Sequence, residues 1–118
     1  MPSTEQLIKT LYAAFNERDI DAALELMRPD VDWPNGMEGG RVHGHSEVRA
    51  YWTRQWGIIN PSVEPTHIED DDAGRTVVVV HQVIRDLSAK LLKDQTVRHV
   101  YTFRDGLVER MDIVPSAD

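Results

Sequence analysis

The segment Val97–Val114 holds a histidine and an aspartate that could act together as an acid–base pair. It reads VRHVYTFRDGLVERMDIV, with alternating apolar residues on both sides of Asp105-Gly106. Asp-Gly between alternating runs predicts a β-hairpin, because glycine readily adopts the positive φ that a two-residue turn needs. With such a turn, His99 pairs with Asp112, and the Cβ atoms of directly opposite residues lie roughly 4.5–5.5 Å apart. A carboxylate at that distance can orient an imidazole, the side chain best suited to proton transfer near neutral pH.

A three-residue loop with Gly106 in the left-handed conformation is the alternative for this hairpin. It would place His99 opposite Met111 and turn Asp112 to the other face of the sheet, because side chains alternate along a strand. The pair also has a purely structural interpretation, as a cross-strand contact that stabilises the sheet or a dimer interface. The sequence leaves these alternatives open.

A second candidate lies in the first half of the chain, where Trp33 ends a short predicted strand and Asn35 follows in Pro-Asn-Gly. The amide of Asn35 could bind a carbonyl group or a water molecule at the rim of a pocket. The alternative is a buried tryptophan followed by an ordinary turn asparagine.

Two further groups of side chains could in principle bind a metal ion, but the spacing of neither favours a metal site. His43 and His45 flank Gly44, but two imidazoles hold a metal ion poorly without a third ligand, and no other residues show metal-ligand spacing. The four carboxylates of Glu69–Asp72 lack the spacing of a calcium loop and are typical of a solvated turn. We therefore expect neither metal nor cofactor.

The sequence pattern is helical in the N-terminal half of the chain and strand-like in the C-terminal half. Ser3 and Gln6 form a capping box before a helix with an apolar stripe up to Phe15. Asp19 caps a short second helix whose stripe reaches Met27, and Ser46 caps a third. The third helix has Val48, Tyr51, Trp52 and Trp56 on one side. After Asn60-Pro61 the pattern predicts strands: a broken strand at Val63–Glu69, then Arg75–Asp86, a strand ending at Arg104, and Leu107–Val114. This order predicts an α+β fold, with three N-terminal helices packed on an antiparallel sheet.

Composition narrows the class of protein. A chain of 118 residues fits one domain, residues 1–118, and its net charge of −7 argues against nucleic acid or an anionic membrane as a partner. It contains no cysteine and no apolar run of the roughly 20 residues that span a bilayer, so a cytoplasmic protein is the default expectation. Val77–Val80 places valines on both faces of its strand, so we expect a homodimer through the outer sheet face.

Three phrases resemble the nuclear-transport-factor-2-like superfamily, especially its SnoaL-like polyketide-cyclase and ketosteroid-isomerase-like members. They are LIKTLYAAFNERDIDAALELM, GHSEVRAYW and VYTFRDGLVERMDI. The resemblance implies a strongly curved sheet wrapped by helices into a cone with an apolar pocket, usually dimeric through the sheet. It specifies function poorly, because one fold hosts many activities.

The catalytic residues of the ketosteroid isomerases are not present at the matching positions. Leu11 stands where the resemblance implies the tyrosine, and Asn35 and His99 stand where it implies the two aspartates. The SnoaL-like cyclases match better, since they use an aspartate on the last strands with a nearby histidine, as Asp112 and His99 stand here. The epoxide-hydrolase group matches less well. Trp33 and Asn35 resemble its Tyr-x-Asn pair, but His81-Gln82-Val83 stands in place of its Arg-x-Asp.

These observations predict a protein that binds an apolar small molecule. If it is an enzyme, it is a cofactor-independent cyclase, isomerase or dehydratase that removes a proton α to a carbonyl group. Asp112 would be the base, His99 its partner or a donor, and Asn35 an auxiliary donor. The alternative is a non-catalytic module that binds a hydrophobic ligand or only dimerises. The residues expected to line the pocket are Tyr12, Trp33, Trp52, Trp56, Tyr101 and Met111.

Overall fold

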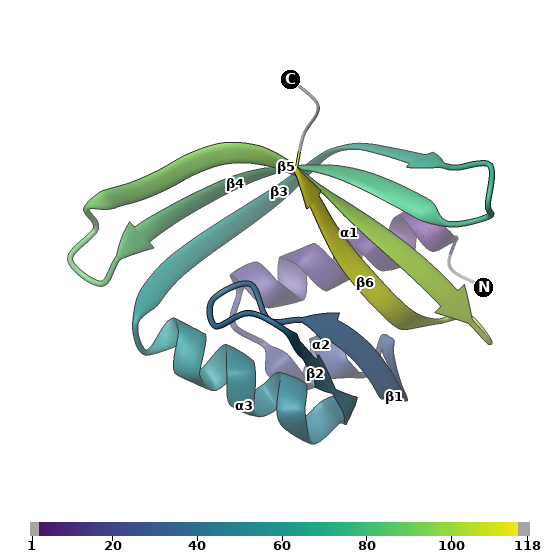
Figure 1. Cartoon of the computed structure of the whole chain (residues 1–118), viewed down its shortest axis with the longest axis horizontal. Helices are drawn as coiled ribbons and strands as arrows, with labels where there is room; N and C mark the ends of the chain where they lie inside the picture. The colour runs from purple at the N-terminus through teal and green to yellow at the C-terminus, as the bar shows by residue number, and fades with distance from the viewer. Residues whose placement is uncertain (1–2, 116–118) are drawn as a thin grey trace.

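The computed structural model describes residues 3–115, in which three helices accompany one six-stranded sheet. Figure 1 shows the long strands of the sheet arching over α1, with α3 and the remaining strands β1 and β2 on the opposite side of the molecule. The elements in chain order are α1 (Thr4–Asn16), α2 (Ile20–Leu24), β1 (Met27–Pro34), β2 (Arg41–His43), α3 (Gly44–Trp56), β3 (Ile59–Asp70), β4 (Thr76–Asp86), β5 (Leu91–Arg104) and β6 (Leu107–Pro115).

The first two helices begin where the sequence predicts. The Ser3 hydroxyl accepts the Gln6 backbone N–H at 3.1 Å, and the Asp19 carboxylate accepts that of Ala22 at the same distance. Each cap satisfies a backbone donor that the first helical turn leaves without a partner. The second helix is shorter than predicted. It ends at Leu24, and Met27 opens strand β1 instead of completing the helical stripe.

The start of α3 differs from the prediction of a Ser46 cap. The helix begins at Gly44, directly after β2, and the His43 N–H donates to the Glu47 carboxylate at 2.8 Å. Gly44 has a φ of +80°, and a Cβ atom there would lie 3.3 Å from the Pro29 carbonyl oxygen. Glycine therefore allows the chain to turn from strand to helix without the polar loop that a Ser46 cap would require.

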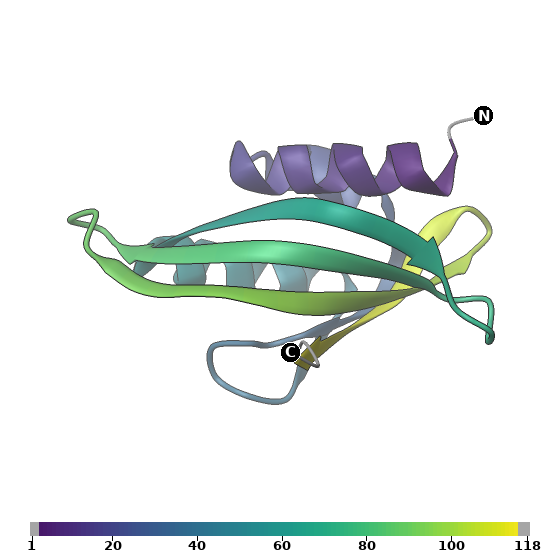
Figure 2. The same ribbon diagram turned by 90° about the horizontal axis from the view of Figure 1, so that it is seen from above.

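The sheet has the strand order β2-β1-β6-β5-β4-β3, and it is mixed. The predicted purely antiparallel sheet is wrong in one place, because β1 runs parallel to β6 while the other neighbours are antiparallel. The segment expected as a broken strand at Val63–Glu69 is part of the long β3, with its irregularity between Pro65 and His67. Irregularities of this kind bend a strand and increase its twist, which suits a curved sheet (Figure 2).

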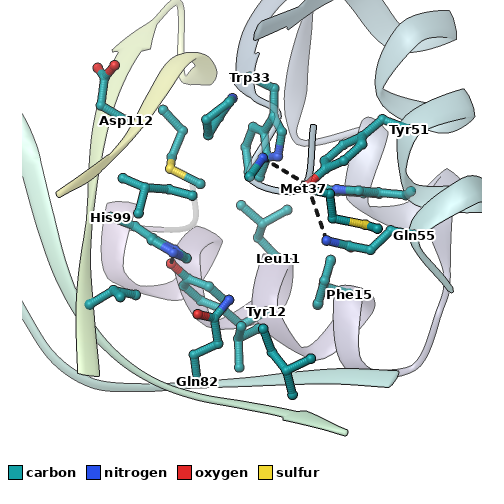
Figure 3. A pocket seen from close by; sticks show the side chains of 18 of the residues that line it. Leu11, Tyr12, Phe15, Trp33, Met37, Tyr51, Gln55, Gln82, His99 and Asp112 are labelled. Atoms are coloured by element: carbon teal, nitrogen blue, oxygen red, sulfur yellow. Dashed lines mark hydrogen bonds between the residues drawn. The ribbon is translucent and has the colours of Figure 1, made fainter. Parts of the chain in front are cut away.

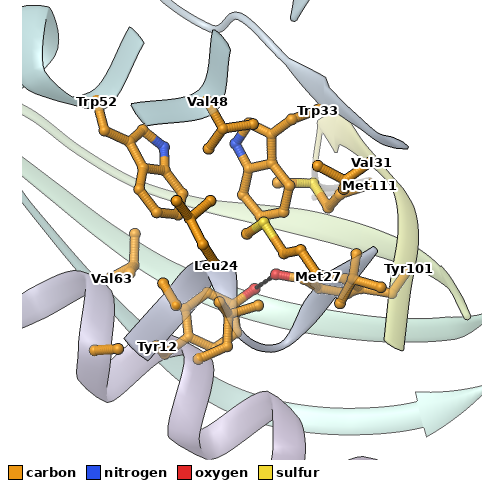
Figure 4. Close-up of a cluster of buried hydrophobic side chains, with 14 of the residues drawn as sticks. Tyr12, Leu24, Met27, Val31, Trp33, Val48, Trp52, Val63, Tyr101 and Met111 are labelled. Atoms are coloured by element: carbon orange, nitrogen blue, oxygen red, sulfur yellow. Dashed lines mark hydrogen bonds between the residues drawn. The ribbon is translucent and has the colours of Figure 1, made fainter. Parts of the chain in front are cut away.

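Aromatic and branched side chains from the helices and the concave sheet face form the core (Figure 4). Trp52 of α3 and Tyr101 of β5 are its largest fully buried members. The rings of Trp33 and Trp52 meet edge to face, with centroids 5.6 Å apart. The core joins α1, α3 and the sheet, and so fixes the positions of the side chains between them.

Within residues 3–115, no helix is long and apolar enough to cross a membrane.

Candidate functional site

The hairpin that carries His99 and Asp112 has the predicted two-residue turn, but its register changes beyond the turn. Arg104 pairs with Leu107, and Asp105 and Gly106 have φ of 55° and 79°. An irregularity then leaves Glu109 between the paired positions, so that His99 lies opposite Ile113 and Asp112 opposite Val100. The predicted pairing of His99 with Asp112 is therefore wrong. The alternative pairing with Met111 is wrong too, because Met111 pairs with Tyr101.

The extra residue places the histidine and the carboxylate on opposite faces of the sheet. His99 shares a row with Val78 and Ile113 on the concave face, whereas Asp112 shares one with Val100 and Val77 on the other face. Figure 3 shows the Asp112 carboxylate directed away from the cavity that His99 lines.

Arginines hold the Asp112 carboxylate in place. Arg110 donates to both of its oxygens at 3.0 Å, and Arg41 donates to one of them at 3.1 Å. The hydrogen bonds from Arg110 are the main cause that lowers the pKa of Asp112 below its usual value. A carboxylate with a lowered pKa and two arginine partners is a weak base. Arg41 and Arg110 also bond Asp32, which links β1, β2 and β6 through one charged network.

A cavity of about 390 Å³ lies between α1, α3 and the concave face of the sheet. Aromatic and aliphatic side chains supply much of its wall, and polar side chains are spaced around it (Figure 3). Five of the six residues predicted to line a pocket contribute to this wall: Tyr12, Trp33, Trp52, Tyr101 and Met111.

Two predicted site residues lie elsewhere. Trp56 does not line the cavity. Its ring packs against Phe15, and the guanidinium of Arg18 lies over it, 5.0 Å from the ring centroid, in a cation–π contact. The Asn35 side chain is occupied within its own turn. Its amide nitrogen donates to the Glu38 carboxylate at 2.9 Å, and its oxygen accepts the Glu38 backbone N–H at 2.8 Å. Asn35 thus has the structural role of a turn asparagine.

The polar group at the centre of the site is a buried chain of two tyrosines and His99. The Tyr101 hydroxyl donates to the Tyr12 oxygen at 2.8 Å, and the Tyr12 oxygen lies 2.6 Å from Nδ1 of His99. Burial raises the pKa of both tyrosines above the usual value, so their protons remain in place. Burial also lowers the pKa of His99 to about 4, so the imidazole is neutral at pH 7.

This chain of hydrogen bonds determines where the histidine proton lies. The Tyr12 oxygen receives the Tyr101 proton, and the Tyr12 proton is then available for Nδ1 of His99. If Nδ1 of His99 donated instead, one buried tyrosine proton, that of Tyr101 or that of Tyr12, would have no acceptor among the described residues. A neutral imidazole that accepts at Nδ1 carries its hydrogen on Nε2, so we assign the Nε2–H tautomer to His99.

His99 Nε2 is buried and has no hydrogen-bond partner within the described residues. A buried donor without a partner costs roughly 1–3 kcal/mol, and such a cost is commonly recovered when a ligand supplies the acceptor. His99 is part of the cavity wall, so the oxygen of a ligand that reaches Nε2 would supply the acceptor.

The sequence indicated His99 but missed Tyr12 as its partner, since 87 positions separate them. Tyr12 was expected to line the pocket, but not to bond a histidine. Gln55, Gln82 and Gln95 also line the cavity and were not predicted. The sequence offers one indication that Gln55 belongs to the site: it lies one helical turn after Tyr51, on the same face of the helix.

Within residues 3–115, no three His, Cys, Asp or Glu side chains gather closely enough to hold a metal ion. His45 contacts the Met27 carbonyl oxygen at 3.0 Å, and His43 lies 3.5 Å from the Asp32 carboxylate.

Comparisons with known proteins agree with the predicted resemblance. The profile of the SnoaL-like domain matches residues 8–111. The structure of TerC co-crystallised with polyporic acid is 27% identical in sequence over 95% of this chain and 90% of that chain, with a TM-score of 0.81. An NTF2-like protein of unknown function from Burkholderia pseudomallei is 26% identical over 98% of this chain and 92% of its own, with a TM-score of 0.83.

A proposed polyketide cyclase from Sinorhizobium meliloti shares the fold at 21% identity, over 96% of this chain and 94% of its own, with a TM-score of 0.77. No curated protein matches the sequence.

Proposed function

We propose that this chain, which belongs to the SnoaL-like domain family, binds an apolar small molecule by a carbonyl or similar oxygen that accepts a hydrogen bond from His99. The observation that carries the proposal is the buried Nε2 of His99, which has no partner among the described residues although the residue His99 is part of a cavity wall. Small-molecule sites typically enclose roughly 300–1,000 Å³ and combine apolar walls with a few placed polar groups. The cavity beside His99 has this size and composition.

A cyclase-like reaction is the second candidate, and the neutral His99 is the observation that favours it. A fixed N–H that points at a carbonyl oxygen stabilises the negative charge that develops there during enolisation or ring closure. Asp112 is not the base in this proposal, because its carboxylate points away from the cavity and is held by Arg110 and Arg41. Asp112 borders the cavity without directing its carboxylate into it, and the described residues of the wall include no other acidic side chain that could be the base. Binding is therefore the better supported of the two functions.

Polyporic acid is a suitable first probe, because TerC was co-crystallised with it. Trp33 and Trp52 line the cavity, so a bound aromatic ligand should quench their fluorescence. We expect saturable quenching by the wild type and a loss of affinity of about 10- to 100-fold in His99→Leu, since the oxygen would lose its hydrogen bond and remain buried.

Asp112→Asn is the matched control, because it changes a charge on the other face of the same hairpin. We expect it to bind polyporic acid as the wild type does. Equal affinity of the wild type and His99→Leu, or a loss confined to Asp112→Asn, would contradict the assignment of His99 as the anchor.

We also propose that two copies of the chain pair through the convex sheet face. Val77, Val79 and Val83 are half-buried there, and Val114 is exposed. Apolar side chains in such a row favour cover by a second sheet. Sedimentation at micromolar concentration should give a dimer, and Val79→Asp should shift it to a monomer. A monomeric wild type would contradict this proposal.

A further inference from the structure

Tyr51 and Gln55 form a second polar group in the cavity wall, one helical turn apart on α3. The Tyr51 oxygen accepts the Gly36 backbone N–H at 3.0 Å and the Gln55 side-chain N–H at 3.2 Å. Neither contact uses the proton of the Tyr51 hydroxyl. The Gln55 Oε1 atom is buried and has no partner within the described residues.

The two side chains therefore present one donor and one acceptor next to each other. A carbonyl oxygen of a ligand could use only the donor, and an N–H group only the acceptor. A hydroxyl group matches both, because it can donate to Gln55 Oε1 while it accepts from Tyr51.

This second polar group lies across the cavity from His99. Figure 3 shows Gln55 entering from α3 on one side and His99 from β5 on the other, with Leu11 and Phe15 of α1 along the wall. Each side thus carries one buried polar atom without a partner, and apolar side chains separate the two. The other amides of the wall differ, because Gln95 donates to the Gln82 oxygen at 2.7 Å, and neither side chain has a buried polar atom without a partner among the described residues.

We propose that the ligand is an apolar hydroxy-carbonyl compound, whose oxygen acceptor meets His99 and whose hydroxyl group meets Gln55 and Tyr51 at the α3 side. This assignment rests on the proposed function and adds the second recognition group. Gln55 is then a residue that determines specificity, since it distinguishes a hydroxylated ligand from the same skeleton without the hydroxyl.

The test compares 4-acetylbiphenyl with 4-acetyl-4′-hydroxybiphenyl, which differ in one hydroxyl group at the end away from the ketone. Titrations followed by tryptophan fluorescence and calorimetry give the affinity of each probe for the full chain. We expect the wild type to bind the hydroxylated probe about tenfold more tightly, the effect of one satisfied buried polar group. Gln55→Met should lose most of this preference, because only the Tyr51 donor remains, whereas Gln95→Met, the control at another cavity amide, should keep it.

Equal affinity of the wild type for the two probes would overturn the inference, as would a preference lost in Gln95→Met and kept in Gln55→Met. If both probes bind equally and His99→Leu weakens both, the inference fails while the proposed function stands. If neither probe binds, both fail. Should Gln55→Met not fold, Tyr51→Phe removes the donor of the pair and should reduce the same preference; an unchanged preference in Tyr51→Phe would overturn the inference.

Discussion

The buried neutral His99 should make the stability of the protein depend on pH in a way that one substitution removes. Burial lowers its pKa from 6.5 to about 4 in the folded chain. Between these two values the unfolded chain binds a proton that the folded chain does not. The free energy of unfolding therefore falls as the pH drops from about 6.5 to about 4, and the contribution is fully present above the unfolded value.

The size of this effect follows from the displacement of the pKa. At about 1.4 kcal/mol per pH unit, the change from 6.5 to about 4 corresponds to roughly 3 kcal/mol. His99 is only 6% exposed, so solvent does little to reduce the effect. In His99→Gln, the amide oxygen can still accept the Tyr12 proton, but no group at this position titrates.

Urea unfolding at about pH 7 and about pH 4.5 measures the difference for both proteins. Carboxylates lose stabilising contacts in acid in both, so the comparison isolates the histidine. We expect the wild type to lose roughly 2–3 kcal/mol more than His99→Gln over this interval. If the wild type and His99→Gln lose the same free energy of unfolding over this interval, His99 is not buried in a neutral form.

Three further predictions concern the elements that support the site. Tyr12→Phe should lower the free energy of unfolding by roughly 2–4 kcal/mol in urea, since Tyr101 and His99 each lose a buried partner; an unchanged value would contradict the hydrogen-bonded chain. Asp112→Asn should lower it by about 1 kcal/mol or less, because its ion pairs are partly exposed; a loss of several kcal/mol would show that the charged network is essential to the fold. Gly106→Ala should cost about 1–2 kcal/mol in thermal unfolding, since φ is +79° in the turn; a neutral result would mean that the turn adopts another conformation.

The sequence was sufficient for features that depend on local rules. The caps at Ser3 and Asp19 and the two-residue turn at Asp105-Gly106 follow from backbone donors and positive φ, and all three are present. The start of α3 was misplaced because one reason for a glycine at position 44 is the close approach of the Pro29 carbonyl, a contact between distant segments that the sequence does not reveal.

The candidate site depended on long-range features that the sequence does not carry. One extra residue at Glu109 shifts the strand pairing and moves Asp112 to the other face, and no side-chain pattern in VERMDIV marks that position. His99 was recognised by its chemistry, but its tautomer follows from Tyr12 and Tyr101, which come from a helix and a strand far apart in the chain. The same holds for Gln55, whose importance arises from the cavity that surrounds it.

The central claim is that His99 offers an Nε2–H to an oxygen of a bound apolar ligand. The most direct measurement is the NMR spectrum of ¹⁵N-labelled histidine side chains, recorded with and without saturating polyporic acid and assigned by the loss of signals in His99→Gln. We expect a neutral His99 protonated at Nε2 in the protein alone, with an Nε2 resonance that shifts on binding while Nδ1 changes little. A His99 protonated at Nδ1, or an Nε2 resonance that does not move in the saturated protein, would contradict the claim.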